Sequence, residues 1–243
     1  MEKQQRLDKV LSSQSTYSRS EIKKMMKNGQ ITVNGISVQK SDIKINPERD
    51  TVAVNGKTVC LKQYIYLLMD KPSGVVCAVS DKKDTTVIDI IPEEYKRKGL
   101  FPVGRLDKDT QGLLMITNDG EFSHKITSPK TNLYKTYHAV IDSDITPEDT
   151  EAFENGIVFK DGTKCRKAFL RQLPNTEEPT VEVKICEGMF HQVKKMLAVR
   201  GKKVIRLRRT AIGNLCADSI FNKRKIIEMN YLELYRILFD KLH

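Results

Sequence analysis

The stretch GRLDKDTQGLL, residues 104–114, holds two basic and two acidic side chains between two apolar segments. The flanking segments, 101–103 and 113–116, have the aromatic and aliphatic composition of strands. Taken alone, Arg105 and Asp107 would belong to a solvated turn, which is the usual meaning of a short charged stretch between strands. Such a turn can also form the floor of an active site, because catalytic residues are often carried on loops that a rigid sheet holds in place.

The composition is that of a globular protein with a large excess of positive charge. Hydrophobic residues make up 39% and charged residues 30% of the 243 residues, enough for one large domain or for a small and a larger one. The net charge of +11 and the pI near 9.3 indicate a polyanionic partner, although a merely basic soluble protein has the same composition. Nucleic acid is favoured over a membrane surface, because the sequence has no amphipathic anchor or lipidation signal.

The sequence gives no indication of secretion, a membrane span or a metal site. Its first ten residues lack the apolar region of a signal peptide and no apolar run is long enough to cross a membrane, so we expect a cytoplasmic protein. The cysteines are scattered, which is typical of reduced core thiols, and the histidines lack metal-ligand spacing. These residues are Cys60, Cys77, Cys165, Cys186 and Cys216, and His124, His138, His191 and His243.

Two amphipathic helices are predicted at the start of the chain. Residues 4–13 place their apolar side chains on one helical face. A second helix is expected to begin at Ser18, where Ser18 and Glu21 have the spacing of a capping box, and to end at Gly29.

Two hairpins are predicted to follow, at the Asn-Gly pairs 34–35 and 55–56. Residues 1–60 contain eleven basic and six acidic side chains, so this segment is more basic per residue than the remainder. A solvated helix face is the usual meaning of such charges. The helical basic residues are Arg6, Lys9, Arg19, Lys23, Lys24 and Lys27.

The pattern changes near residue 60, and we expect a small domain at 1–60 and a larger one at 61–243. Strands are predicted at 64–70, 112–118, 133–141, 165–173, 180–186 and 203–209, and helices at 119–126, 146–156 and 190–201. Because regular β-α-β alternation is missing, the larger domain is predicted to be α+β with a mixed, largely antiparallel sheet and flanking helices.

The N-terminal segment RLDKVLSS…YSRSEIKKMMKNGQITVNG, within residues 6–35, resembles the small RNA-binding module named after ribosomal small-subunit protein four, written here as the S-four module. In that module two helices present basic side chains to RNA phosphates. The resemblance implies that the six helical basic residues contact RNA, through contacts that position the RNA without reading its sequence.

A second basic segment, residues 191–209, carries eight Lys or Arg and no acidic residue in 19 positions. Its apolar residues have helical and then strand spacing. We expect one buried face and one face turned to a polyanion.

The stretch 104–114, together with KTY at 135–137 and EGMFHQVKKM at 187–196, resembles the pseudouridine synthases of the branch with an N-terminal S-four module. LMDKPSGVVC and IRLRRTAIGNL extend the resemblance over the whole chain. It implies the pseudouridine synthase fold and the isomerisation of uridine in RNA. That reaction needs no cofactor, and the sequence has neither a G-x-G-x-x-G fingerprint nor a P-loop.

The resemblance also assigns the candidate site. Asp107 matches the catalytic aspartate, since a carboxylate can serve as nucleophile, as base, or as both in turn. Arg105 matches a residue near the flipped-out nucleotide, and Tyr137 a tyrosine whose ring stacks on uracil. Lys194 matches a basic residue that pairs with the aspartate and keeps it ionised, and Leu207 an apolar residue of the pocket.

Two neighbouring positions receive other expectations. Asp109 would point away from Asp107 on an extended backbone, so we expect a structural role for it. Met189 departs from the family, which has a basic or polar residue there, and this puts the RNA contacts of its loop in doubt.

The segment EFSHKITSPKTNLYKTY, residues 121–137, is most similar to enzymes acting on small-subunit (16S) ribosomal RNA. We therefore expect rRNA as the partner, either free or within an assembling small-subunit particle, and a monomeric enzyme. The alternatives are the same chemistry on 23S rRNA and a non-catalytic rRNA-binding or ribosome-assembly protein. The set of Asp107, Tyr137 and Lys194 speaks against a pure binding protein.

Overall fold

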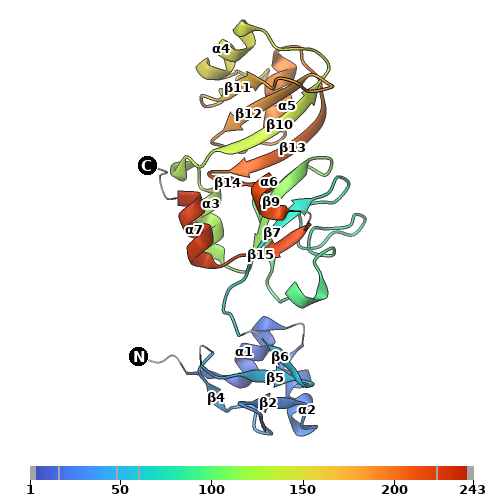
Figure 1. The fold of residues 1–243 in the computed structure, drawn as a ribbon, viewed down its shortest axis with the longest axis vertical. Coiled ribbons are helices and arrows are strands. Elements are labelled where there is room, and N and C mark those ends of the chain that lie inside the picture. The colour runs from blue at the N-terminus through green and yellow to red at the C-terminus, as the bar shows by residue number, and fades with distance from the viewer. Residues whose placement is uncertain (1–3, 16, 48, 60, 223, 240–243) are drawn as a thin grey trace. The chain divides into compact units, whose positions relative to one another are not determined.

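The computed structural model describes residues 4–15, 17–47, 49–59, 61–222 and 224–239 (Figure 1). They form two compact units. The first takes the described residues up to Ile65 together with Ile91–Leu100, and the second takes Tyr66–Ile90 and the described residues from Phe101 onward. No helix of the described part is long and apolar enough to cross a membrane. The four described cysteines are free, whereas Cys60 and His243 lie outside the described residues.

The first unit begins with the two predicted helices, α1 (Leu7–Gln14) and α2 (Arg19–Lys27). The Ser18 side chain accepts a hydrogen bond from the Glu21 backbone and the Glu21 carboxylate accepts one from the Ser18 backbone, which confirms the capping box. The apolar faces of both helices pack into one core. Its buried members are Leu7, Val10, Leu11, Ile22, Met26, Ile31, Ile45, Val52 and Leu61.

Both predicted hairpins are present in the first unit. They form a four-stranded sheet in the order β3-β2-β5-β6, from β2 (Ile31–Val33), β3 (Ile36–Ser37), β5 (Val52–Val54) and β6 (Lys57–Val59). Asn34 and Asn55 both have a φ of 51°, as a type I′ turn requires. β1 (Gln5–Arg6) pairs with β4 (Lys44–Ile45), and Glu93–Tyr95 forms a short 3-10 helix.

The second unit contains one nine-stranded sheet within the described residues (Figure 1). Seven strands run in the order β11-β12-β10-β13-β9-β7-β15, while β8 pairs with β9 and β14 with β13. The strands are β7 (Tyr66–Lys71), β8 (Phe101–Val103), β9 (Gln111–Thr117), β10 (Lys135–Ile141), β11 (Phe169–Gln172), β12 (Thr180–Ile185), β13 (Val204–Ile212), β14 (Leu215–Cys216) and β15 (Ile226–Glu228). Every pairing is antiparallel except that of β13 with β9, so the predicted mixed, largely antiparallel sheet is confirmed.

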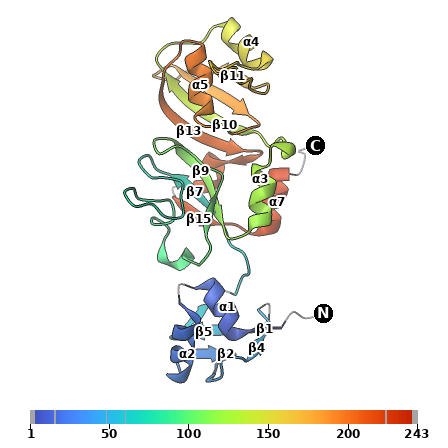
Figure 2. The ribbon, with the colours of Figure 1, turned by 180° about the vertical axis from the view of Figure 1, so that it is seen from behind.

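Five helices pack on this sheet in two groups. α3 (Gly120–Thr127) and α7 (Tyr231–Phe239) lie side by side in both ribbon views, and their apolar faces share a core with β7, β8 and β9 (Figure 2). α4 (Pro147–Asn155) and α5 (Gln192–Val199) lie at the other half, near β11, β12 and β13 (Figure 2). α6 is the short Ala217–Phe221, and Pro129–Thr131 is a 3-10 helix.

One predicted boundary and one missing helix need correction. The strand predicted at 165–173 begins only at Phe169, because the backbone amides of Cys165 and Ala168 donate to the carbonyls of Ile157 and Phe153 and not to a neighbouring strand. α7 was not predicted at all.

The two halves of the sheet meet where β9 begins. β9 runs antiparallel to β7 over six pairs but touches β13 through only two parallel pairs, Gln111 with Arg208 and Gly112 with Arg209. Gly112 has a φ of 102°, and a Cβ atom there would lie 2.2 Å from the carbonyl oxygen of Arg209. Only glycine therefore allows the two halves to approach this closely.

We predict that Gly112→Ala destabilises the second unit by roughly 2–5 kcal/mol, since the methyl group meets backbone and the φ is unfavourable. Urea unfolding followed by circular dichroism measures the change. Gly120→Ala is the matched control: no atom lies within 4 Å of its Cβ position, and the helical site should gain about 0.4–1 kcal/mol. An unchanged unfolding midpoint for Gly112→Ala would contradict the close approach.

Candidate active site

The loop that carries Asp107 connects β8 to β9 and is held from inside the protein. Its turn closes through the Thr110 amide, which donates to the Asp107 carbonyl at 3.1 Å. Lys71, which is fully buried, donates from Nζ to the carbonyls of Pro72, Lys108 and Thr110 at 3.0, 3.2 and 2.8 Å. Burial lowers the pKa of this lysine, and its three acceptors replace the water that it gives up.

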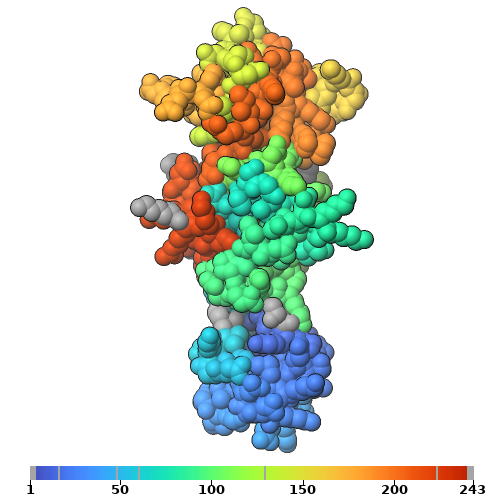
Figure 3. Space-filling model, turned by 90° about the vertical axis from the view of Figure 1, so that its right-hand side faces the viewer, coloured from blue at the N-terminus to red at the C-terminus, as the bar shows by residue number. Residues whose placement is uncertain are grey.

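The residues that follow β7 hold the loop from a second side. The Gly74 amide donates to the Lys108 carbonyl at 2.8 Å, and the Leu106 amide donates to the sulfur of Cys77 at 3.3 Å. Burial raises the pKa of the Cys77 thiol, so the sulfur remains a neutral acceptor. Figure 3 shows this segment, coloured teal, on the surface of the second unit.

Lys194, from α5, lies against two carboxylates of the loop. Its Nζ is 3.2 Å from Oδ2 of Asp107 and 2.6 Å from Oδ1 of Asp109. Burial alone would lower the pKa of Lys194, but the hydrogen bonds to Asp109 and Asp107 raise it. In turn, the hydrogen bond from Lys194 lowers the pKa of Asp109. One ammonium group thus pairs with two carboxylates that lie more than eighty residues away in the sequence.

The expected direction of the Asp109 side chain was wrong, whereas its structural role stays a prediction. The backbone is not extended at this point, because it turns at Lys108 and Asp109. Alternation of side chains therefore does not apply, and Asp109 and Asp107 face the same ammonium group.

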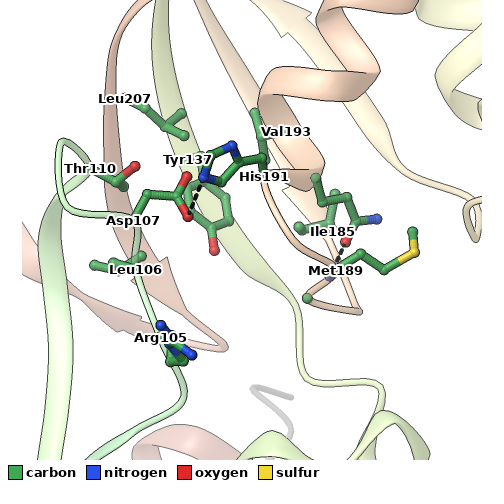
Figure 4. Close-up of a pocket in the computed structure, with 12 residues that line it drawn as sticks. Arg105, Leu106, Asp107, Thr110, Tyr137, Ile185, Met189, His191, Val193 and Leu207 are labelled. Carbon is green, nitrogen blue, oxygen red and sulfur yellow. Dashed lines mark hydrogen bonds and ion pairs between the residues drawn. The ribbon is translucent and has the colours of Figure 1, made fainter. Parts of the chain in front are cut away.

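His191 is a site residue that the sequence did not indicate. Its Nε2 lies 3.5 Å from Oδ1 of Asp107 (Figure 4), whereas Lys194 contacts the other oxygen, Oδ2. The ring stacks on Phe190 with 3.8 Å between centroids. His191 has a φ of 53°, so α5 begins at Gln192 and not at residue 190 as predicted. Its position three residues before Lys194, at the helix start, was the available signal.

Asp107 borders two adjoining cavities, the smaller of which is shown in Figure 4. Arg105 and Tyr137 line both cavities and Leu207 lines the smaller one, whereas Lys194 lines neither. The main cavity has a volume of about 680 Å³, within the range of small-molecule sites. It is lined by Arg105, Asp107, Lys135, Tyr137, His191 and Arg209, among others. A smaller one beside it is lined by Asp107, Tyr137 and Leu207. Tyr137 and Leu207 are almost buried, whereas Arg105 is exposed.

The loop of Met189 is fixed by Gln192. The Met189 amide donates to the Gln192 side-chain oxygen at 3.0 Å, and the Gln192 amide group donates to Glu187 at 2.6 Å. Met189 is half-buried and lines both cavities, so at this position the protein presents an apolar side chain to the site.

The basic segment 191–209 is more neutral than its sequence suggests, so the expected face turned to a polyanion is only partly present. Arg200 and Lys202 pair with Asp149, Arg206 with Glu178 and Arg208 with Asp70. Arg209 is buried and donates to the Leu113 carbonyl at 2.7 Å. Lys195 and Lys203 form no salt bridge with the described residues.

The helices of the first unit keep their positive charge. Lys9, Arg19, Lys23, Lys24 and Lys27 are exposed and form no salt bridge in the described part of the chain. Arg6 differs, because its guanidinium donates to both carboxylate oxygens of Asp8 at 3.1 and 3.0 Å. These hydrogen bonds lower the pKa of Asp8. The described residues contain no group of three or more His, Cys, Asp or Glu that could hold a metal ion.

Comparison with known proteins identifies the class. The family model for RNA pseudouridylate synthase matches residues 65–199, and the model for the S4 domain matches residues 5–50. The chain belongs to the RNA pseudouridylate synthase family and is an enzyme that isomerises uridine to pseudouridine. A solved structure described as pseudouridylate synthase has a TM-score of 0.64 at 29% identity, covering 96% of this chain and 99% of that one.

Several relatives are similar over nearly their full lengths. An uncharacterised RNA pseudouridine synthase of Bacillus subtilis is 36% identical over 95% of this chain and 97% of its own. Ribosomal small subunit pseudouridine synthase A of Vibrio cholerae is 38% identical over 88% of this chain and 90% of its own. The protein of the same name from Escherichia coli K12 is 36% identical, with 88% and 91% covered.

We predict that Lys194→Met moves the acid limb of the kcat/KM profile toward higher pH by about one unit. Because Lys194 lowers the pKa of Asp109, its removal raises that pKa. Asp109 then takes up a proton at a higher pH, and the share of activity that depends on its charge is lost earlier as the pH falls. Rates of pseudouridine formation between pH 5 and 8.5 measure the shift.

Lys195→Met, one residue further along the helix, is the control for this experiment. Its ammonium lies over the rings of Phe159 and Phe190 and contacts neither aspartate. The same pH profile for wild type and Lys194→Met would refute the shared-cation account.

Proposed function

We propose that the protein isomerises a specific uridine of small-subunit (16S) ribosomal RNA, with Asp107 as the catalytic carboxylate. The observation that carries this proposal is the position of Asp107, at the border of both cavities and paired with Lys194 and His191. The choice of RNA is supported by the relatives named for the small ribosomal subunit, at 35–38% identity.

The reaction breaks the bond between N1 of uracil and C1′ of the ribose, turns the base and joins its C5 to C1′. The proton on C5 leaves and N1 gains one, so no atom is added or lost. The carboxylate of Asp107 either attacks C1′ or removes a proton, and in both cases the ammonium group of Lys194 lies 3.2 Å from it. Tyr137 stacks on the base beside Leu207, and the exposed Arg105 assists the nucleotide that has left the RNA stack.

The two parts of the chain have separate tasks in this proposal. Residues 1–60 hold the RNA through phosphate contacts, and residues 61–243 carry out the isomerisation. The free positive charges of α1 and α2 support the first task. We infer that the enzyme acts as a monomer in the cytoplasm, on free rRNA or on an assembling particle.

Asp107→Asn is predicted to abolish pseudouridine formation, by at least about 10³-fold, while RNA affinity remains within about threefold of wild type. The amide cannot act as a nucleophile or base but keeps the size of the side chain. Chemical mapping of pseudouridine in the rRNA of a deletion strain, complemented with wild type or variant, measures both the target and the activity.

Asp109→Asn is the matched control, since it removes the same charge two residues away and leaves Lys194 on Asp107. It should retain activity within about tenfold of wild type, the scale of one exposed ion pair. Restoration of the modification by Asp107→Asn would overturn the role of Asp107. A missing modification in 23S rRNA, with 16S rRNA unchanged, would overturn the choice of RNA.

The double variant Lys23→Gln/Lys24→Gln is predicted to weaken RNA binding and to flatten its dependence on salt. Each phosphate contact that is lost reduces the slope of log K against log salt concentration by about 0.7–0.9. Fluorescence anisotropy at several salt concentrations measures the slope. Lys40→Gln/Lys57→Gln removes the same charge from exposed positions outside the helices and serves as control. Equal slopes for both double variants would contradict an RNA-binding helix face.

A further inference from the structure

The main cavity contains a cationic part that pairing within the protein does not neutralise. Lys135 lines the cavity and is half-buried, and its side chain forms no hydrogen bond or ion pair with any described residue. Arg209 lines the same cavity and is 4% exposed. Its Nε donates to the Leu113 carbonyl, but its Nη2 is buried without a partner in the described part of the chain. Burial, and then the charge of Arg209, lowers the pKa of Lys135.

The acidic residues of this cavity are already engaged elsewhere. Asp107 is paired with Lys194 and His191. Glu187 accepts hydrogen bonds from the Gln192 side chain at 2.6 Å and from the Arg166 amide at 2.9 Å. The charges of Lys135 and Arg209 therefore repel one another with no anion between them, an arrangement that a bound anion would stabilise.

The register of β10 and β13 places this pair beside the base-binding side chains. Tyr137 lies directly across from Arg209, so the two side chains share one face of the sheet. Lys135 lies two residues along β10 from Tyr137, about 7 Å, on that same face. Leu207 lies two residues from Arg209 in the other direction along β13. Tyr137 thus stands between the catalytic side of the site and the cationic part.

We propose that Lys135, supported by the charge of Arg209, binds a phosphate group of the RNA next to the target uridine. The inference rests on the proposed function, in which the base lies at Tyr137 and Leu207 and the ribose at Asp107. Uracil is neutral at the start of the reaction, whereas each phosphodiester carries a full negative charge. The separation between Lys135 and Tyr137 is of the order of one nucleotide, so a base stacked on Tyr137 brings a phosphate within reach of the ammonium group.

The contact between Lys135 and the phosphate would fix how far the flipped nucleotide enters the main cavity. Phosphate contacts position nucleic acid without reading its sequence, and a charge-assisted hydrogen bond in a largely buried site is stronger than one at an exposed surface. The first unit would then hold the RNA as a whole, while Lys135 would fix the one nucleotide that reacts.

The test uses the full-length enzyme and an RNA in which the wild type forms pseudouridine. In a set of such RNAs, a single uncharged methylphosphonate replaces each phosphate near the target in turn. One replacement adjoining the target uridine is expected to lower the wild-type kcat/KM by about 10- to 100-fold, the scale of one charge-assisted hydrogen bond. Lys135→Gln is expected to lower kcat/KM on unmodified RNA by a similar factor. Combining Lys135→Gln with the sensitive methylphosphonate is expected to lower kcat/KM no further than either change alone.

Lys160→Gln, an exposed lysine outside the cavities, is the control for the loss of charge and should behave as wild type. Lys135→Arg keeps the charge and is expected to retain both activity and sensitivity to the methylphosphonate. The proposal would be overturned if the methylphosphonate lowered kcat/KM of Lys135→Gln by the same factor as that of the wild type. It would also be overturned if no phosphate beside the target were sensitive to the replacement. A folded Lys135→Arg that is as inactive as Lys135→Gln would overturn it as well.

These outcomes are separate from a failure of the proposed function. If the wild type modifies 23S rRNA, the choice of RNA fails, and the methylphosphonate series is made in that RNA. If Asp107→Asn is active, the proposed role of Asp107 is wrong. The comparison of Lys135→Gln with the methylphosphonate RNA then still tests the contact between Lys135 and the phosphate.

Discussion

The close approach of Gly112 to the backbone of Arg209 is the constraint on which the second unit depends. It joins two antiparallel half-sheets through two parallel residue pairs. The loop of Asp107 ends immediately before this junction, and β13 continues from it with Leu207 and Arg209. Residues from both halves can therefore surround one cavity. A side chain at position 112 would separate the halves and with them the two sides of the site.

Two lysine side chains fix the loop of Asp107, which the junction of the half-sheets places beside the cavity. Lys71 and Lys194 both contact the loop of Asp107, Lys71 through the carbonyl groups of Lys108 and Thr110 and Lys194 through two carboxylates. A buried lysine is costly unless its donors are satisfied, and Lys71 meets this condition with the backbone of the loop. The conformation of the loop and the pairing of its carboxylates thus have separate supports, so the position of Asp107 is fixed by contacts within the protein.

Local signals explain which parts of the structure the sequence could predict. The capping box at Ser18 and the Asn-Gly hairpins are encoded within a few residues, and both are present. Tertiary contacts decided the rest. The expectation for Asp109 assumed an extended backbone, His191 lies beside Asp107 only through the packing of α5, and α7 is defined by a shared core with α3. The family resemblance supplied Asp107, Tyr137 and Lys194, which the spacing of residues alone would not.

The same distinction applies to charge, because a sequence shows basic residues but not their partners. The helices of the first unit and the segment 191–209 look equally suited to RNA in the sequence. In the structure most basic residues of the segment pair with acids from distant positions, whereas five of the helical ones do not. The proposed general affinity for RNA is therefore assigned to the first unit. In the second unit Lys135 lies without an ion-pair partner among the described residues in the main cavity, where the proposed phosphate contact would position a single nucleotide and add little to binding over a broad surface.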